Sequence, residues 1–472
     1  MRQSVLRGPV LGVVLLVACG SGVAGEAHRA AAATSAPSTQ LPKALLTAYE
    51  RQVVSGTRTV YVEATGGSDA ADGDSKKTAY ATIQHAVDVA RPGDRILVGA
   101  GTYGYLSVYG YRGDATHWLS IQSVSAGVRP VIDVADGSGD DGVDIQESSF
   151  VGLYGFQVEG LQTSPSPNPS GVAVFRDSDH VFIWNNDIHD FPGGGVNDFY
   201  SPATTYDGNV LPAGGWDLVD VSFNTIHDTS RYNPTNTSGI SFYGAVATST
   251  DTLDGFGYRA VGNYVYDVIC QVDSTSGAGT YPYVTDGNGI SIDSLSVPYV
   301  PGLAAYTEPG LIEGNVLAGN GGRAVHVFNS VNVDGYFNTA VGNLRTDSPA
   351  IDGGVELDSN VPDGNVRFYG NVIVPLDTTN TTDAVSTYTA DVIAGGTESV
   401  PPGNIDRRSV GPAYLHGDPT TATVTTAQPM SYFLPALRDR VPFEPGMTGY
   451  QALDTGRVRT AGPVPAGALG NG

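Results

Sequence analysis

Two short sequence units alternate along this chain from about residue 116, and this repeat constrains the fold more than any other feature. One unit is a glycine or alanine followed by alternating apolar residues, as in GISFY, GISID, AVHVF and GVELD. The other is an apolar-x-apolar run that ends two or three residues later in asparagine, at Asn186, Asn224, Asn263, Asn315, Asn338 and Asn371. Short strands recurring at roughly 22 to 30 residues with no helix between them predict a parallel β-solenoid.

The recurring asparagine is expected to form a ladder inside this solenoid. Equivalent positions of successive coils stack about 4.8 Å apart, so one residue type can hydrogen-bond to itself along the axis. We interpret the ladder as structural and assign it no chemistry.

The segment from 59 to 103 precedes the repeat and has a strand, an Asp/Gly-rich loop, a helix and a second strand. The helix has one apolar face, because Ile83, Ala86, Val87 and Ala90 are spaced at i, i+3, i+4 and i+7. Together with the repeat, this segment resembles the right-handed parallel β-helix proteins of the pectate lyase type, over about residues 59 to 375. The resemblance implies an all-β, single-stranded, right-handed parallel β-helix with an N-terminal helix cap, and it is specific for fold rather than activity.

Five segments follow from this interpretation. Arg2 and Arg7 precede an apolar run too short to span a bilayer, so residues 1–19 are predicted to be a signal peptide. Its end, LVAC, is similar to a lipobox, so Cys19 is either lipidated or lost when the protein is secreted. Residues 20–55 are predicted to be a flexible tether, 56–115 the N-terminal cap and first coil, 116–375 the β-helix, and 376–472 a C-terminal cap and tail.

The charge of the chain limits the ligands it can bind, and its cysteine content limits its disulfide bonds. The chain has 48 acidic against 24 basic residues, a net charge of -24, which argues against nucleic acid because phosphates need a basic surface. Cys270 alone remains beside the signal region, so no disulfide framework is expected. We expect an extracellular or cell-surface monomer that binds a polysaccharide and meets the membrane only through an N-terminal lipid.

Long loops follow the strands GVNDF, GISFY and GISID, and others precede the glycine strands at 229–237 and 269–285. They predict a groove over the middle of the solenoid, lined by GISFY, GISID, AVHVF and GVELD, since loops longer than stacking requires are often functional. Strand alternation then gives two outward columns. The first column is predicted to hold Ser241, Ser291, His326 and Glu356, and the second Tyr243, Asp293, Phe328 and Asp358, with Asn288 and Arg323 near the strand starts.

His326 is the first candidate catalytic residue, since a neighbouring Glu356 would orient it as a general base or acid; a surface histidine satisfied by Glu356 is the alternative. Arg323 could neutralise a uronate carboxylate, or be an ordinary exposed arginine. Tyr243 could protonate a leaving oxygen or stack on a sugar ring. Asp293 could pair with Asp358 across about 9.6 Å as in inverting glycosidases. The residues Asn288, Ser291, Glu356 and Asp358 are predicted to contact substrate.

The segment DGNGISID is similar to the segment of family 9 pectate lyases in which an Asp-Gly-Asn-Gly run opens the strand that bears the catalytic lysine. Ser291 stands at the lysine position, and no lysine follows Lys77. The calcium-binding aspartates of that family would fall at Thr237, Ser238 and Ser241, so its mechanism is not expected here. Calcium remains open as a cofactor through a separate acidic tower of Asp190, Asp228 and Asp267.

Three functions are compatible with these residues. The first is a polysaccharide lyase that acts on a uronic-acid polymer by β-elimination through His326 and Arg323. The second is an inverting-type glycoside hydrolase that uses the groove carboxylates. The third is a non-catalytic β-helix that binds glycans at the cell surface.

Overall fold

A computed structural model describes residues 56–374 and the short strands at 405–406, 441–442 and 463–464. Within the first range it leaves out 125–127, 136–140, 162–168, 207–208, 212, 236, 254, 276–282, 299–301, 337, 352–355, 360–363 and 370. The predicted signal peptide, lipidated Cys19, tether and most of the C-terminal cap therefore lie outside the described residues.

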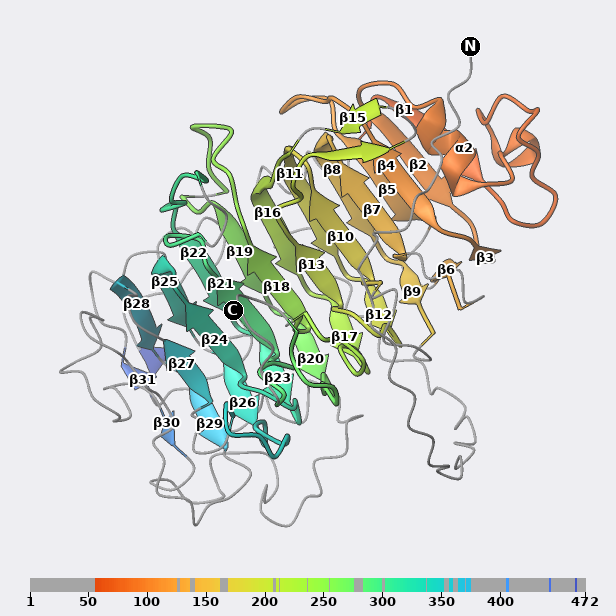
Figure 1. Ribbon diagram of the computed structural model, residues 1–472. Helices are drawn as coiled ribbons and strands as arrows, with labels where there is room; N and C mark the ends of the chain where they lie inside the picture. The colour runs from red at the N-terminus through yellow and green to blue at the C-terminus, as the bar shows by residue number, and fades with distance from the viewer. Residues whose placement is uncertain are drawn as a thin grey trace, which may run out of the picture.

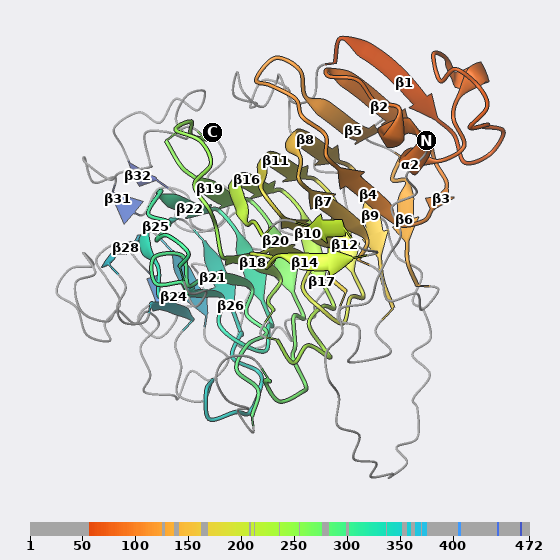
Figure 2. The same ribbon diagram turned by 45° about the horizontal axis from the view of Figure 1, so that its top comes forward.

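Three parallel sheets form the body of the protein, and each coil from β2 to β27 contributes one strand to each sheet (Figures 1 and 2). Sheet 1 consists of β1 (Arg58–Val62), β2 (Asp94–Val98), β5 (Leu119–Ser123), β8 (Ser149–Tyr154), β11 (Ser178–Trp184), β16 (Trp216–Ser222), β19 (Tyr258–Val261), β22 (Gly310–Glu313), β25 (Val331–Tyr336) and β28 (Gly364–Tyr369). Sheet 2 consists of β4 (Leu106–Tyr109), β7 (Val143–Gln146), β10 (Val172–Phe175), β13 (Val196–Asp198), β18 (Ile240–Tyr243), β21 (Ile290–Asp293), β24 (Val325–Phe328) and β27 (Leu357–Ser359). Sheet 3 consists of β3 (Thr102–Tyr103), β6 (Val131–Asp133), β9 (Gln157–Glu159), β12 (Asp187–His189), β17 (Thr225–His227), β20 (Tyr264–Tyr266), β23 (Val316–Ala318), β26 (Thr339–Val341), β29 (Val372–Val374) and β30 (Ile405–Asp406).

A few elements lie outside these sheets. They are the 3-10 helix η2 (Lys76–Thr78), the helix α2 (Ile83–Asp88), and two antiparallel pairs, β14 (Thr204–Tyr206) with β15 (Asn209–Leu211) and β31 (Val441–Pro442) with β32 (Pro463–Val464). Ile83 and Ala86 of α2 pack into the solenoid core; that α2 caps the solenoid end stays a prediction. Within the described part of the chain, no helix combines the length and apolar character needed to cross a membrane.

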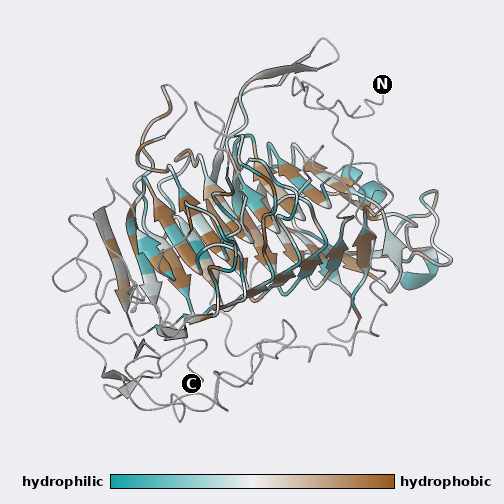
Figure 3. Cartoon of the chain, turned by 60° about the horizontal axis from the view of Figure 1, so that its bottom comes forward, coloured by the Kyte–Doolittle hydropathy of each residue, from teal (hydrophilic) through white to brown (hydrophobic). Residues whose placement is uncertain are grey.

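The core lies between the three sheets, and strand alternation fills it (Figure 3). Ile240, Phe242, Ile290 and Ile292 are fully buried, as the alternation predicted. Asp198 is the exception: it occupies the inward position between Val174 and Phe242 of the adjacent coils. It is fully buried, and neither carboxylate oxygen has a hydrogen-bond partner among the described residues.

The predicted asparagine ladder is confirmed. Each asparagine side chain donates to the side-chain oxygen of the next, for example from Asn224 to Asn263 at 3.1 Å and from Asn263 to Asn315 at 3.0 Å. The same oxygens accept the preceding backbone N–H groups, as from Asn263 N to Asn315 at 2.9 Å. The ladder contains all six predicted members, Asn186, Asn224, Asn263, Asn315, Asn338 and Asn371. Its polar groups are thus satisfied within the turns between sheets 1 and 3.

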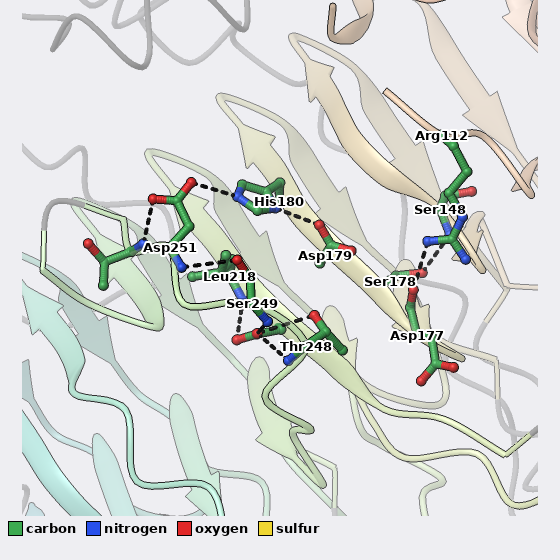
Figure 4. Close-up of polar contacts among 12 residues, drawn as sticks. Arg112, Ser148, Asp177, Ser178, Asp179, His180, Leu218, Thr248, Ser249 and Asp251 are labelled. Carbon is green, nitrogen blue, oxygen red and sulfur yellow. Dashed lines mark hydrogen bonds and ion pairs between the residues drawn. The ribbon is translucent and has the colours of Figure 1, made fainter. Parts of the chain in front are cut away.

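The long loops after β18 and β21 pack against sheet 1, which differs from the predicted groove wall. Leu253 of the first loop lies in an aromatic cluster with Trp118 and Trp184. Asp217 of β16 accepts the backbone N–H groups of the same loop, and His180 of β11 contacts its Asp251 (Figure 4). Tyr306 of the second loop is buried in the core and donates to Asp217 at 2.8 Å, so both loops are anchored on sheet 1.

Candidate functional site

Strand register places the first predicted column on the outer face of sheet 2. Ser241 pairs with Ser291, and Ser291 pairs with His326, as expected. The next coil brings Asp358, not Glu356, opposite His326. The predicted pairing of His326 with Glu356 is therefore wrong by two residues, a slip that preserves the inward and outward alternation.

Glu356 belongs instead to a second ladder inside the turns between sheets 3 and 2. Asn320 donates to Asn343 at 2.8 Å, and Asn343 donates to Glu356 through its side chain at 2.8 Å and its backbone at 3.2 Å. Burial raises the pKa of Glu356 to about 7, opposed by the hydrogen bonds from Asn343. With an exposed fraction of 1%, Glu356 cannot contact a substrate directly, contrary to the prediction.

Asp358 joins His326 and Arg323 into one cluster. Its Oδ2 lies 2.9 Å from His326 Nδ1 and 2.7 Å from Arg323 Nε. Because a carboxylate only accepts, His326 Nδ1 carries the proton, and in the neutral ring Nε2 is left as the basic nitrogen. Sequence reasoning named all three residues, but it placed Asp358 in the column of Asp293 as a substrate contact.

Both the backbone and the guanidinium of Arg323 are held by hydrogen bonds. Its backbone N–H donates to Asn288 Oδ1 at 2.8 Å, and its Nη2 donates to the carbonyl of Ala350 at 3.0 Å. Its side chain is 12% exposed, and that of Asp358 is 5% exposed. A guanidinium fixed in this way holds Asp358 as an anion, which in turn fixes the orientation of the His326 ring.

Asp293 lies in the second outward column, where it pairs with Tyr243 on one side and Phe328 on the other. Burial raises the pKa of Asp293 to about 6, opposed by a 2.6 Å hydrogen bond from Ser294 and by the nearby His326. Asp293 and Asp358 therefore stand in different columns, and the predicted carboxylate pair does not form. The site instead combines an oriented histidine with a carboxyl group that is protonated at mildly acidic pH.

Two of the predicted substrate contacts are structural. Asn288 is fully buried and donates to Asp286 at 2.8 Å while accepting from Arg323, so it positions the start of β24. Ser291 is 4% exposed and lies between Ser241 and His326. Tyr243 is half-buried at the end of β18, beside Asp293.

The residues at the family calcium position do not fit that ion. The backbone N–H of Ser238 donates to the Ser241 hydroxyl at 3.0 Å, and the side chains of Thr237, Ser238 and Ser241 carry no carboxylate. The acidic tower is divided among basic side chains, because Asp190 and Asp228 contact His189 and His227, and Asp267 contacts Arg345. Among the residues that the structure describes, no three His, Cys, Asp or Glu side chains group closely enough to hold a metal ion.

Comparison with solved structures identifies the architecture. Pectate lyase Pel9A superposes with a TM-score of 0.50 at 13% identity, over 89% of this chain and 98% of that one. The chain shares its right-handed parallel β-helix fold. An alginate lyase from Paenibacillus sp. str. FPU-7 matches with a TM-score of 0.42 at 18% identity, over 74% of this chain and 98% of that one. The A-module of the Azotobacter vinelandii mannuronan C-5 epimerase AlgE4 matches with a TM-score of 0.34 at 15% identity, over 69% and 90%.

Sequence comparison adds no family. No protein-family model matches the chain, and no curated protein matches it. At these identities the structural likeness carries the fold alone, so the chemistry rests on the residues of sheet 2.

Proposed function

We propose that this protein is a carbohydrate-active β-helix that cleaves a uronic-acid-containing polysaccharide by β-elimination. The observation that carries the proposal is the contact of Asp358 with both His326 and Arg323 on the outer face of sheet 2. Among the three candidate functions, elimination is the one that needs an oriented neutral base beside a cation.

The reaction would begin at His326 Nε2. This nitrogen takes the proton from the carbon next to the uronate carboxylate, while the Asp358 carboxylate accepts the Nδ1 hydrogen bond and stabilises the imidazolium that forms. Arg323 stabilises the negative charge that develops on the substrate carboxylate. Electrons from the broken C–H bond form the new C=C bond.

The departing glycosidic oxygen needs a proton. Asp293 would supply it, because its raised pKa of about 6 keeps a large fraction of the carboxyl protonated at mildly acidic pH. Tyr243, which neighbours Asp293 on the adjacent strand, is the second donor within the same column. Expulsion of this oxygen leaves one unsaturated and one hydroxyl chain end.

Geometry disfavours the glycoside hydrolase. An inverting hydrolase needs one carboxylic acid and one carboxylate that activates water. Glu356 is enclosed in the second ladder, and Asp358 is engaged by His326 and Arg323. Neither carboxylate is placed to activate a water opposite Asp293.

A panel of acidic and neutral polysaccharides tests the proposal. The full chain is incubated with each polymer, and near-ultraviolet absorbance and new reducing ends are followed together, with and without a calcium chelator. We expect both signals to rise together on at least one uronic-acid polymer, with a His326→Ala loss of about 10²-fold or more. The matched control is His117→Ala, a histidine that also contacts an aspartate, at 2.9 Å, far from this site. Reducing ends without absorbance, or full activity in His326→Ala, would overturn the proposal.

A further inference from the structure

Five aromatic side chains share one outward position of sheet 2. The column that contains Asp293 runs through seven successive coils as Tyr109, Gln146, Phe175, Phe199, Tyr243, Asp293 and Phe328. Phe199 directly follows β13, and the register of β13 with β10 and β18 places it between Phe175 and Tyr243. We call the residues Tyr109, Phe175, Phe199, Tyr243 and Phe328 the aromatic column.

These rings lie outside the solenoid core, so the core does not require them. Tyr109 is 44% exposed, and Phe199, Tyr243 and Phe328 are partly exposed. Phe175 and Phe199 stack on each other, with ring centroids 4.8 Å apart and planes at 15°. Phe175 is buried at 9% exposure beneath this surface, and Gln146 and Asp293 interrupt the row of rings. A cluster of exposed apolar rings marks a binding surface more often than a lone exposed residue does.

The neighbouring outward column is made of short side chains. Beside the central rings it presents Ala173, Asn197, Ser241 and Ser291. No long side chain of sheet 2 therefore rises next to Phe199 and Tyr243.

The aromatic column is continuous with the candidate catalytic cluster. The ring centroid of Phe328 lies 5.9 Å from that of His326, with the planes at 27°. Phe199 is three strands away from β24, or about 14 Å at the usual strand spacing. One ligand extended along the solenoid axis would therefore meet both.

We propose that the aromatic column binds several sugar rings of one polysaccharide chain, on the N-terminal side of the bond that is cleaved. Pyranose rings have apolar C–H faces that pack on aromatic rings, while their hydroxyls point sideways to water. The strand spacing of about 4.8 Å is close to the advance of one sugar in an extended chain, so successive coils meet successive sugars. This inference rests on the proposed function for the position of the cleaved bond, and its binding step stands without it.

The consequence is a dependence on substrate length. A sugar packed on Phe199 lies about three residues from the bond held at His326, and one packed on Tyr109 lies further still. Short oligosaccharides cannot reach these rings. Loss of Phe199 should thus raise KM for long chains and leave kcat, and all activity on short chains, nearly unchanged.

Affinity electrophoresis through gels that contain alginate, polygalacturonate or xylan tests the binding step. All variants are made in the His326→Ala background, so that no polymer is consumed. We expect at least one polymer to retard the parent, and Phe199→Ala and Tyr109→Ala each to weaken that retardation about tenfold, while Phe199→Tyr retains it. The control is Tyr266→Ala, which removes a ring stacked at 4.7 Å on His227 of sheet 3.

The alternatives give distinct results. The inference is overturned if Phe199→Ala and Tyr109→Ala are retarded as strongly as the parent. It is also overturned if none of the polymers retards the parent. A lower molar mass of Phe199→Ala than of the parent, measured by light scattering without polysaccharide, would also overturn the inference. The rings would then join two copies of the chain. Failure of the proposed function appears separately, as normal retardation of the parent with no unsaturated ends formed by the active chain.

Discussion

Replacing Asp198 by valine is expected to stabilise the protein. The carboxyl group lies inside the solenoid between Val174 and Phe242, with no hydrogen-bond partner among the described residues. An unpartnered buried polar group costs about 1–3 kcal/mol, and a buried valine side chain adds about 1.5 kcal/mol in favour of folding. We therefore expect Asp198→Val to raise the free energy of unfolding by about 2.5–4.5 kcal/mol at pH 5.

The gain should grow as the pH rises. Burial holds the pKa of Asp198 well above its ordinary value, so the folded chain keeps a proton that the unfolded chain releases. The contribution of Asp198 to stability is then fully present below the unfolded pKa. This contribution is lost at about 1.4 kcal/mol per pH unit as the pH rises from the pKa of Asp198 in the unfolded chain to its higher pKa in the folded chain. Asp198→Val removes this loss.

Guanidinium unfolding monitored by circular dichroism at pH 5, 6, 7 and 8 measures the effect. Asp198→Asn separates the two causes, because it abolishes the ionisation but leaves a buried polar group. We expect Asp198→Asn to show the same pH dependence as Asp198→Val, which other groups set, with a smaller stability at every pH. If Asp198→Val is no more stable than the parent, or if its advantage is the same at pH 5 and pH 8, the reasoning is refuted.

Three further perturbations test other parts of the account. Arg259→Met should lower the free energy of unfolding by about 3–5 kcal/mol, because it leaves the buried Asp220 carboxylate, which Arg259 Nε contacts at 2.9 Å, without its counter-charge. The double variant Arg259→Met/Asp220→Leu should recover most of this loss. A double variant no more stable than Arg259→Met would contradict the pairing. Asn263→Ala breaks the asparagine ladder on both sides and should cost about 2–4 kcal/mol by denaturant titration, whereas a loss under 1 kcal/mol would mean the ladder is dispensable. Turnover should fall as the pH rises above about 6, where Asp293 loses its proton. If the alkaline side of the pH–activity profile is the same in Asp293→Asn as in the parent, this carboxyl is not the acid.

Periodicity was sufficient to predict the solenoid and most of its register. The recurring asparagine identified the turn where the ladder forms, and the alternation in GISFY, GISID and AVHVF placed Ser291 beside His326. The same alternation could not detect the slip of two residues at Asp358, since both registers bury Leu357. That slip decides the site, because it replaces Glu356 by Asp358 as the partner of His326.

Other features depended on contacts between distant segments. The sequence gives no sign that Glu356 would complete the ladder of Asn320 and Asn343, because ladder members are 13 and 23 residues apart. Alternation in GVNDF puts Asp198 inward, where the repeat favours an apolar residue, but the lack of a hydrogen-bond partner for its carboxylate among the described residues appears only in the structure. The aromatic column spans seven coils and becomes visible once those coils are aligned.

Mass spectrometry of the chain ends formed from a cleaved uronic-acid polymer tests the central claim most directly. Elimination by His326 yields one end that is lighter by a water than the corresponding hydrolytic end. We expect this unsaturated end in equal number to the new hydroxyl ends, and its near absence in His326→Ala and Asp358→Asn. Products in which every end has gained water, or unsaturated ends formed at the parent rate by both variants, would contradict the account.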